Sequence, residues 1–208
     1  MLHRLCVLKN LILFGYLCLF LVGCSSLPNK AINTTHQQQL KLLHFAKLNA
    51  IKQFNLKGRI AVNTAGKGYS GGLIWQHTPL NDQLAMFSPL GSKVSEIIKS
   101  EFKVTLTAAD GKQFSAVDAE TLTENTLGWR LPLSGLTQWV IGLANNNASS
   151  MTLDERGRIS TLQEDGWEIE YSQYSQTKGV DLPKKIVLRS PKVNLKLIVD
   201  EWMLPSQL

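Results

Sequence analysis

Apolar and polar residues alternate with a period of two over most of the chain after residue 55. The alternating segments are residues 56–62, 69–75, 84–86, 94–99, 102–106, 151–153, 158–163, 167–171, 186–189 and 193–199. Such alternation is typical of antiparallel strands that turn one face to the core and the other to water. A sheet of about ten strands bends, because strand twist accumulates. The pattern therefore predicts a mostly β protein of the α+β class with a strongly curved antiparallel sheet.

Three segments show helical spacing instead. Apolar residues recur at helical intervals over about residues 37–53, which predicts an amphipathic helix. Asp118 is expected to cap a short helix that reaches Glu124. Ser134 is expected to cap a second one over residues 135–143, whose apolar side carries Leu136, Trp139, Val140 and Leu143. So few helices leave part of the sheet uncovered, and we expect an incompletely closed barrel with helices at its mouth and an apolar cavity.

The first 24 residues have the features of an export signal. A basic leader with Arg4 and Lys9 precedes residues 11–22, an apolar run shorter than the ~18 residues that a membrane-spanning helix needs. The run ends in Leu-Val-Gly-Cys24, which resembles the bacterial lipobox, where cleavage makes the cysteine the acylated first residue. The alternative is an ordinary signal peptide in which Cys24 falls at the cleavage point by chance.

Three segments are expected on this basis. Residues 1–23 form the lipoprotein signal peptide, residues 24–35 a polar, lipidated tether, and residues 36–208 a single domain. Ser25 follows the cysteine, and an acidic residue at that place is the usual signal for retention in the inner membrane. We therefore expect the protein to be lipid-anchored in the outer membrane, on its periplasmic side.

The charge of the chain excludes few partners but disfavours nucleic acid. Loss of residues 1–23 removes Arg4 and Lys9 and no acidic residue, so the net charge falls from +6 to +4. This charge is mild and forms no dense stripe, as a nucleic-acid surface would. The densest basic cluster lies between residues 178 and 196, on expected strands. Lysines at sheet edges usually discourage aggregation, and a surface for an acidic partner protein is the alternative.

No group of residues has a spacing typical of catalysis or metal binding. All three cysteines lie in the first 24 residues, and the four histidines stand at neither metal nor triad spacing. Gly66-x-Gly68-x-x-Gly71 matches the dinucleotide fingerprint, but strand residues follow it rather than a helix, which indicates a hairpin. We therefore expect no enzyme, no metal and no cofactor, although catalytic residues that meet only in space would escape this argument.

Five motifs follow one another along residues 36–203. They are Leu56-Lys-Gly-Arg-Ile-Ala-Val62, Gly72-Leu-Ile-Trp75-Gln, Ser88-Pro89-Leu90-Gly91-Ser, Leu131-Pro132-Leu133 with Gln138-Trp139-Val-Ile-Gly142-Leu, and Gly166-Trp167 with Tyr171 and Tyr174. Together with the lipobox, they make the chain similar to the LolB family of outer-membrane lipoprotein receptors of Gram-negative bacteria. Two features depart from the family. It often has a tryptophan ahead of the first strand, where this chain has His44 and Phe45, and its pattern does not require Trp129.

The resemblance implies both a fold and a function. The fold is an unclosed antiparallel half-barrel with a helical lid that encloses an apolar cavity. The function is that of a receptor which accepts lipoproteins from the periplasmic carrier LolA, holds their acyl chains in the cavity, and inserts them into the outer membrane. The partners would be LolA, the acylated cargo and outer-membrane lipid, and we expect a monomer. A lipid-anchored, non-catalytic scaffold of an outer-membrane assembly machine and a lipid-modifying hydrolase are the alternatives.

The resemblance also implies particular site residues. Cys24 is the lipidation site, and Pro89, Leu90 and Gly91 form a loop that presents one leucine to the membrane. The cavity wall is expected on the apolar faces of the strands and the second helix, although such faces usually form a plain core. The expected cavity residues are Leu73, Trp75, Leu84, Met86, Phe102, Val104, Trp139, Val140, Leu143, Trp167, Ile169, Tyr171, Leu195 and Leu197.

Overall fold

The computed structural model describes residues 30–64 and 66–206. It divides into two compact units, Met1–Thr35 and His36–Leu208. The expected signal peptide, Cys24 and Ser25 lie outside the described residues. Within the first unit residues 30–35, the last six of the expected tether, are helical. Apart from the start of this helix, all that follows concerns the second unit.

The second unit is built on one antiparallel sheet. In the described part of the chain it has eleven strands in the order β6-β5-β4-β3-β2-β1-β11-β10-β9-β8-β7. Because β6 and β7 stand at opposite ends of this order and do not pair, the sheet is unclosed, as predicted. The strands are β1 Phe54–Thr64, β2 Lys67–His77, β3 Asp82–Phe87, β4 Lys93–Lys99, β5 Val104–Ala108, β6 Gln113–Ala116, β7 Ala148–Leu153, β8 Ile159–Glu164, β9 Trp167–Thr177, β10 Val180–Arg189 and β11 Val193–Met203.

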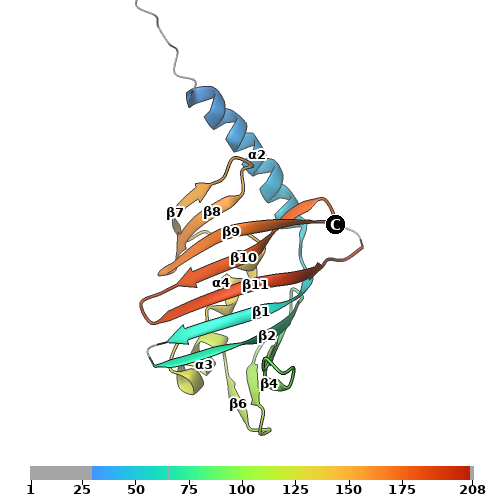
Figure 1. Ribbon diagram of the computed structural model, residues 1–208, viewed down its shortest axis with the longest axis vertical. Coiled ribbons are helices and arrows are strands. Elements are labelled where there is room, and N and C mark those ends of the chain that lie inside the picture. The colour runs from blue at the N-terminus through green and yellow to red at the C-terminus, as the bar shows by residue number, and fades with distance from the viewer. Residues whose placement is uncertain (1–29, 65, 207–208) are drawn as a thin grey trace, which may run out of the picture. The chain divides into compact units, whose positions relative to one another are not determined.

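Three helices accompany the sheet in the described residues: α2 Lys30–Ala50, α3 Ala119–Leu127 and α4 Leu133–Val140. Figure 1 shows β1, β2 and β11 passing in front of α3 and α4, so these two helices lie on one side of the sheet. Leu122 of α3 and Trp139 of α4 are buried in the same core as Leu56 of β1. The side that the helices cover is therefore the apolar, inner face, and the predicted helical lid is present.

The period-two pattern of β1 distinguishes the inner, apolar face of the sheet from its outer, charged face. Leu56 and Gly58 are buried, whereas Lys57 and Arg59 between them are exposed. β1 pairs with β2 on one edge and with β11 on the other, so it joins strands from the two ends of the unit. The central strands therefore carry their apolar residues to the helices and their charged residues to the outer face.

The predicted cap of α3 is confirmed, and the predicted cap of α4 is wrong. A side-chain oxygen of Asp118 accepts the amide N–H of Thr121 at 2.6 Å. α4 instead begins at Leu133 with Pro132 at the cap position, and Ser134 already lies inside the helix. Its hydroxyl donates to a carboxylate oxygen of Glu120 at 3.1 Å, and this hydrogen bond links α4 to α3.

Some element boundaries also differ from the pattern. α2 ends at Ala50 rather than near residue 53, since the amide of Ile51 bonds the carbonyl of Leu48 and closes the last turn. β10 begins at Val180 rather than at residue 186. It contains Pro183, where the pairing with β9 shifts register, and such a bulge is where a strand tolerates a proline. The first half of this strand was not predicted from the sequence, because a proline usually indicates that a strand is interrupted.

Candidate functional site

An enclosed cavity of about 60 Å³ lies between the inner face of the sheet and the segment from the end of α3 to α4. Strands β1 to β4 and β11 form one wall, and residues 129–136 form the other. All twelve lining residues are apolar: Ile60, Val62, Leu73, Trp75, Leu84, Met86, Ile97, Trp129, Leu131, Leu136, Leu195 and Leu197. Such a wall offers a ligand no specific polar contact and suits a hydrocarbon chain.

The structure separates the fourteen expected cavity residues into three groups. Six of them line the cavity: Leu73, Trp75, Leu84, Met86, Leu195 and Leu197. Seven are buried elsewhere in the core: Val104, Trp139, Val140, Leu143, Trp167, Ile169 and Tyr171. Phe102 is 82% exposed in the turn between β4 and β5, so its expected place in the cavity is wrong. The amide and hydroxyl of Ser100 both bond the carbonyl of Lys103, and this tight turn carries Phe102 away from the core.

Sequence reasoning missed the other half of the cavity wall. Ile60 and Val62 alternate in step with Leu56, and this signal could have placed them on the inner face. Trp129 and Leu131 lie in the short connection between α3 and α4, where no periodic pattern applies. Their role follows only from the way this connection crosses the sheet.

Polar bonds attach the lid to β8 and β9. The indole N–H of Trp139 donates to a carboxylate oxygen of Glu164 at 2.8 Å, and the amide of Asn145 donates to the same oxygen at 3.0 Å. The hydroxyl of Tyr171 donates to the carbonyl of Trp139 at 2.8 Å. Burial raises the pKa of Tyr171 well above its usual value, so this hydroxyl stays protonated and remains a donor. The end of α4 is therefore fixed to one half of the sheet.

The contacts of the lid with the other half of the sheet are apolar. Trp129, Leu131 and Leu136 face the cavity and the strands beyond it. The side-chain hydrogen bonds that the described residues show for residues 118–140 stay within this segment or reach β8 and β9. Separation of the lid from β1 to β4 would therefore break hydrophobic contacts and leave the polar attachment intact.

A buried carboxylate fixes one ring of the cavity wall. Asp82, only 3% exposed, accepts the indole N–H of Trp75 at 2.9 Å and lies 2.7 Å from Nδ1 of His77. The ammonium group of Lys99 is 3.8 Å away. Phe54 packs edge-on against Trp75, with ring centroids 5.3 Å apart. The Trp75 ring is thus held in place by a buried hydrogen bond and by an aromatic contact.

The expected membrane loop is a tight turn between β3 and β4. The amide of Ser88 bonds the carbonyl of Ser92, and the amide of Gly91 bonds the carbonyl of Ser88, each at 2.8 Å. Gly91 has a φ of +88°, which favours glycine. Leu90 between them is 95% exposed, the highest value among the large apolar residues described. The turn therefore holds one leucine almost wholly in solvent.

Other kinds of site are not apparent in the part of the chain that the structure describes. Over residues 30–64 and 66–206, no group of three or more histidine, cysteine, aspartate and glutamate residues could hold a metal ion. Among the same residues, no helix is both long and apolar enough to cross a membrane.

Comparisons with known proteins agree on one family. Residues 52–202 match the model of the family described as outer membrane lipoprotein LolB. The chain is 37% identical over 156 residues to outer-membrane lipoprotein LolB of Nitrosomonas europaea, covering 74% of both chains. It is 34% identical over 188 residues to the protein of the same name from Nitrosococcus oceani, covering 89% of this chain and 93% of the relative.

A solved structure with a similar fold comes from Vibrio parahaemolyticus. It is described as an outer membrane lipoprotein-sorting protein domain, and it is 6% identical with a TM-score of 0.51. The match covers 82% of this chain and 94% of the other, and at this identity it speaks for the fold alone. The family match and the identity of the relatives carry the assignment: the chain belongs to the LolB family of outer-membrane lipoproteins.

Proposed function

We propose that the protein is a receptor that accepts lipoproteins from the periplasmic carrier LolA, holds their acyl chains in the cavity, and inserts them into the outer membrane. The observation that carries the proposal is the enclosed cavity with its twelve apolar lining residues. An acyl chain in water is unfavourable by about 0.8 kcal/mol for each CH₂ group. A lipoprotein therefore needs a protein that covers its chains until it reaches a bilayer.

The cavity must widen to take an acyl chain. Its volume is about 60 Å³, whereas ligand pockets commonly measure about 300–1,000 Å³. The lid is bonded to β8 and β9 and has only apolar contacts with β1 to β4, so the cavity side is the side that opens. An entering chain replaces the apolar contacts that opening breaks, which keeps the free-energy cost of opening low.

Release into the membrane is the role of the Leu90 loop. Transfer without an energy-rich cofactor must run towards higher affinity, from carrier to receptor to bilayer. One leucine contributes only about 1.5–3 kcal/mol on burial, which is too little to anchor a protein but enough to orient it. Acylated Cys24 would hold the protein at the membrane, and Leu90 would turn the cavity mouth towards the lipid.

The direct test is transfer from the carrier. Purified full-length protein is mixed with LolA that carries an acylated lipoprotein, and the cargo that remains on the carrier is measured after affinity capture of the carrier. We expect the cargo to leave the carrier for the receptor. A protein that acts only as a scaffold would leave the cargo where it was, and organic extraction of such a protein would yield no copurifying acyl compounds.

A further inference from the structure

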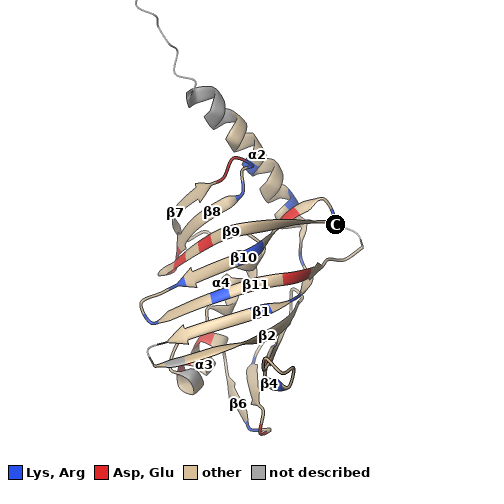
Figure 2. Cartoon of the chain, viewed as in Figure 1, with Lys and Arg blue, Asp and Glu red and all other residues tan. Residues whose placement is uncertain are grey.

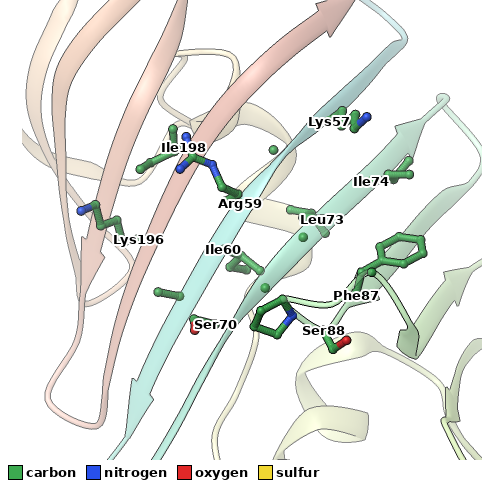
Figure 3. A pocket seen from close by; sticks show the side chains of 16 residues that line it. Lys57, Arg59, Ile60, Ser70, Leu73, Ile74, Phe87, Ser88, Lys196 and Ile198 are labelled. Atoms are coloured by element: carbon green, nitrogen blue, oxygen red, sulfur yellow. The ribbon is translucent and has the colours of Figure 1, made fainter.

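A second hollow lies beside the Leu90 loop, on the outer face of the sheet. It is an open groove of about 730 Å³ where β11, β1 and β2 meet residues 87–91. Figure 3 shows Lys196, Ile198 and Arg59 on one side of the groove and Phe87 and Ser88 on the other. It differs from the cavity under the lid, which has a wholly apolar wall.

Small residues on the outer face create the groove. Ala61, Ser70 and Gly72 occupy neighbouring outward positions on β1 and β2, because Ala61 pairs with Ser70 and Arg59 with Gly72. A Cβ atom on Gly72 would lie 3.4 Å from the Cβ of Phe87. The floor is therefore low, while Phe87 on one side and Ile198 on the other stand higher and give apolar walls.

The rim of the groove is positively charged. Arg59 is balanced by Asp200, with a shortest N–O distance of 2.9 Å, and the hydrogen bond from Arg59 lowers the pKa of Asp200 so that it stays ionised. In the described part of the chain, the ammonium groups of Lys57 and Lys196 form no ion pair and no hydrogen bond, and Lys57 is near enough to Asp200 to help lower the pKa of that carboxyl. Figure 2 shows basic segments on β10 and β11 and an acidic segment towards the end of β11. Basic side chains thus outnumber acidic ones at the rim of this hollow, where Asp200 is shared by Arg59 and Lys57.

The loop that carries the exposed leucine also lines part of the groove. Ser88, Pro89 and Gly91 line the groove, while Leu90 between them points into solvent. If Leu90 enters the lipid, as the proposed function requires, the groove comes to lie at the level of the phosphate groups. Positive charge and apolar walls at that depth are complementary to an anionic lipid.

Resting on that function, we propose that this groove binds one anionic phospholipid of the target membrane. Its phosphate meets Lys196 at one end of the groove, Lys57 adds positive charge at the other end, and part of an acyl chain lies along Ile74, Phe87 and Ile198. A single inserted leucine leaves the protein able to rotate about that one point of contact. A bound lipid adds a second contact on different strands and so fixes the direction in which the cavity mouth faces.

A photoactivatable lipid tests the proposal on the full-length, lipidated protein. The protein is reconstituted in phosphatidylcholine vesicles that contain phosphatidylglycerol with a diazirine in one acyl chain, and cross-linked peptides are identified by mass spectrometry. We expect cross-links on groove residues of β1, β2 and β11, and few from phosphatidylcholine that carries the same diazirine. Replacement of both lysines, Lys57→Gln with Lys196→Gln, should lower the phosphatidylglycerol cross-links about thirtyfold.

Matched lysines outside the groove provide the control. Lys52 and Lys103 are exposed and line no part of it, so Lys52→Gln with Lys103→Gln removes the same charge and should leave the cross-links unchanged. The proposal is overturned if both lipids cross-link equally, if the control pair lowers the yield as much as the groove pair, or if the groove pair impairs only cargo transfer from the carrier without vesicles. The last outcome would show a docking surface for the carrier.

Failure of the proposal can be told from failure of the proposed function. Transfer of cargo from the carrier to the protein is measured with vesicles of phosphatidylcholine alone, where the groove has no anionic lipid to bind. A protein that accepts cargo there but shows no preference for phosphatidylglycerol disproves the lipid groove alone. A protein that accepts no cargo disproves the receptor function.

Discussion

Replacement of Leu90 with glutamate tests the release step most directly. The turn that carries Leu90 is closed by backbone groups of Ser88, Gly91 and Ser92, and the leucine side chain is 95% exposed. Leu90→Glu should therefore change the free energy of unfolding by less than about 0.5 kcal/mol. In lipid, the variant forgoes the burial of one leucine, about 1.5–3 kcal/mol. If insertion of the loop limits delivery, the rate should fall by about tenfold to a hundredfold.

The assay must separate acceptance from delivery. Full-length protein is anchored in liposomes that contain a spin-labelled quencher lipid, and the carrier brings a lipoprotein with a fluorescent acyl chain. Loss of cargo from the carrier reports acceptance, and quenching of the fluorophore reports insertion into the bilayer. We expect Leu90→Glu to accept cargo at the normal rate and to show slow quenching, because the cavity under the lid is unchanged.

The chain offers a closely matched control. Leu80 is 65% exposed and follows Pro79 in the turn between β2 and β3, as Leu90 follows Pro89. Leu80→Glu makes the same chemical change in another turn and should deliver cargo normally. Quenching at the wild-type rate in Leu90→Glu would refute the proposed role of the loop. Equal slowing in both variants would show a general effect of added negative charge.

Three further changes probe the cavity, its wall and the helix α2. Met86→Trp should fill the cavity, reduce acyl uptake in the transfer assay, and lower the free energy of unfolding by about 1–3 kcal/mol. Met151→Trp is the control, because Met151 is half-buried on β7 outside the cavity, and this variant should retain uptake. Asp82→Ala leaves the indole N–H of Trp75 unpaired and should lower the free energy of unfolding, measured in urea, by about 1–3 kcal/mol. Asp82→Asn keeps an oxygen acceptor, so a smaller loss of stability in Asp82→Ala than in Asp82→Asn would contradict this explanation. Burial lowers the pKa of His44, so the unfolded chain binds more protons below about pH 6.5 and stability should fall as the pH decreases. In His44→Leu the free energy of unfolding should depend less on pH between about pH 7 and pH 5, and an unchanged pH dependence would refute the role of His44.

The inner and outer faces of the sheet could be predicted from the sequence, because alternation is a local property. Leu73 and Trp75 on β2 were placed on the inner face by this signal, and the structure confirms their burial there. Phe102 shows the limit of the signal. It continues the alternation of β5, but the hydrogen-bonded turn over residues 100–103 determines its position. The hydrogen bonds of this turn keep Phe102 exposed even though burial of its side chain would be favourable.

Which inner residues border a cavity could not be predicted in the same way. Ile169 and Leu73 are equally apolar and equally well placed on their strands, yet only Leu73 lines the cavity. The difference is set by the lid, since Trp139 packs onto the β8–β9 half of the sheet, where it bonds Glu164, and leaves space over the other half. That choice depends on contacts between residues far apart in the chain. It becomes visible only once the chain is folded.

The open ends of the sheet have a consequence for a protein confined to a membrane. Anchored molecules share a thin layer, so their effective concentration is far higher than in bulk solution, and any exposed strand edge meets other copies often. β6 is an edge of only four residues, Gln113–Ala116. β7, the other edge, departs from regular pairing with β8 at two places, between Ala148 and Ser150 and between Thr152 and Leu153. Short and irregular edges are poor templates for strand addition, so both ends of the sheet resist pairing with other copies even where molecules are crowded on the membrane.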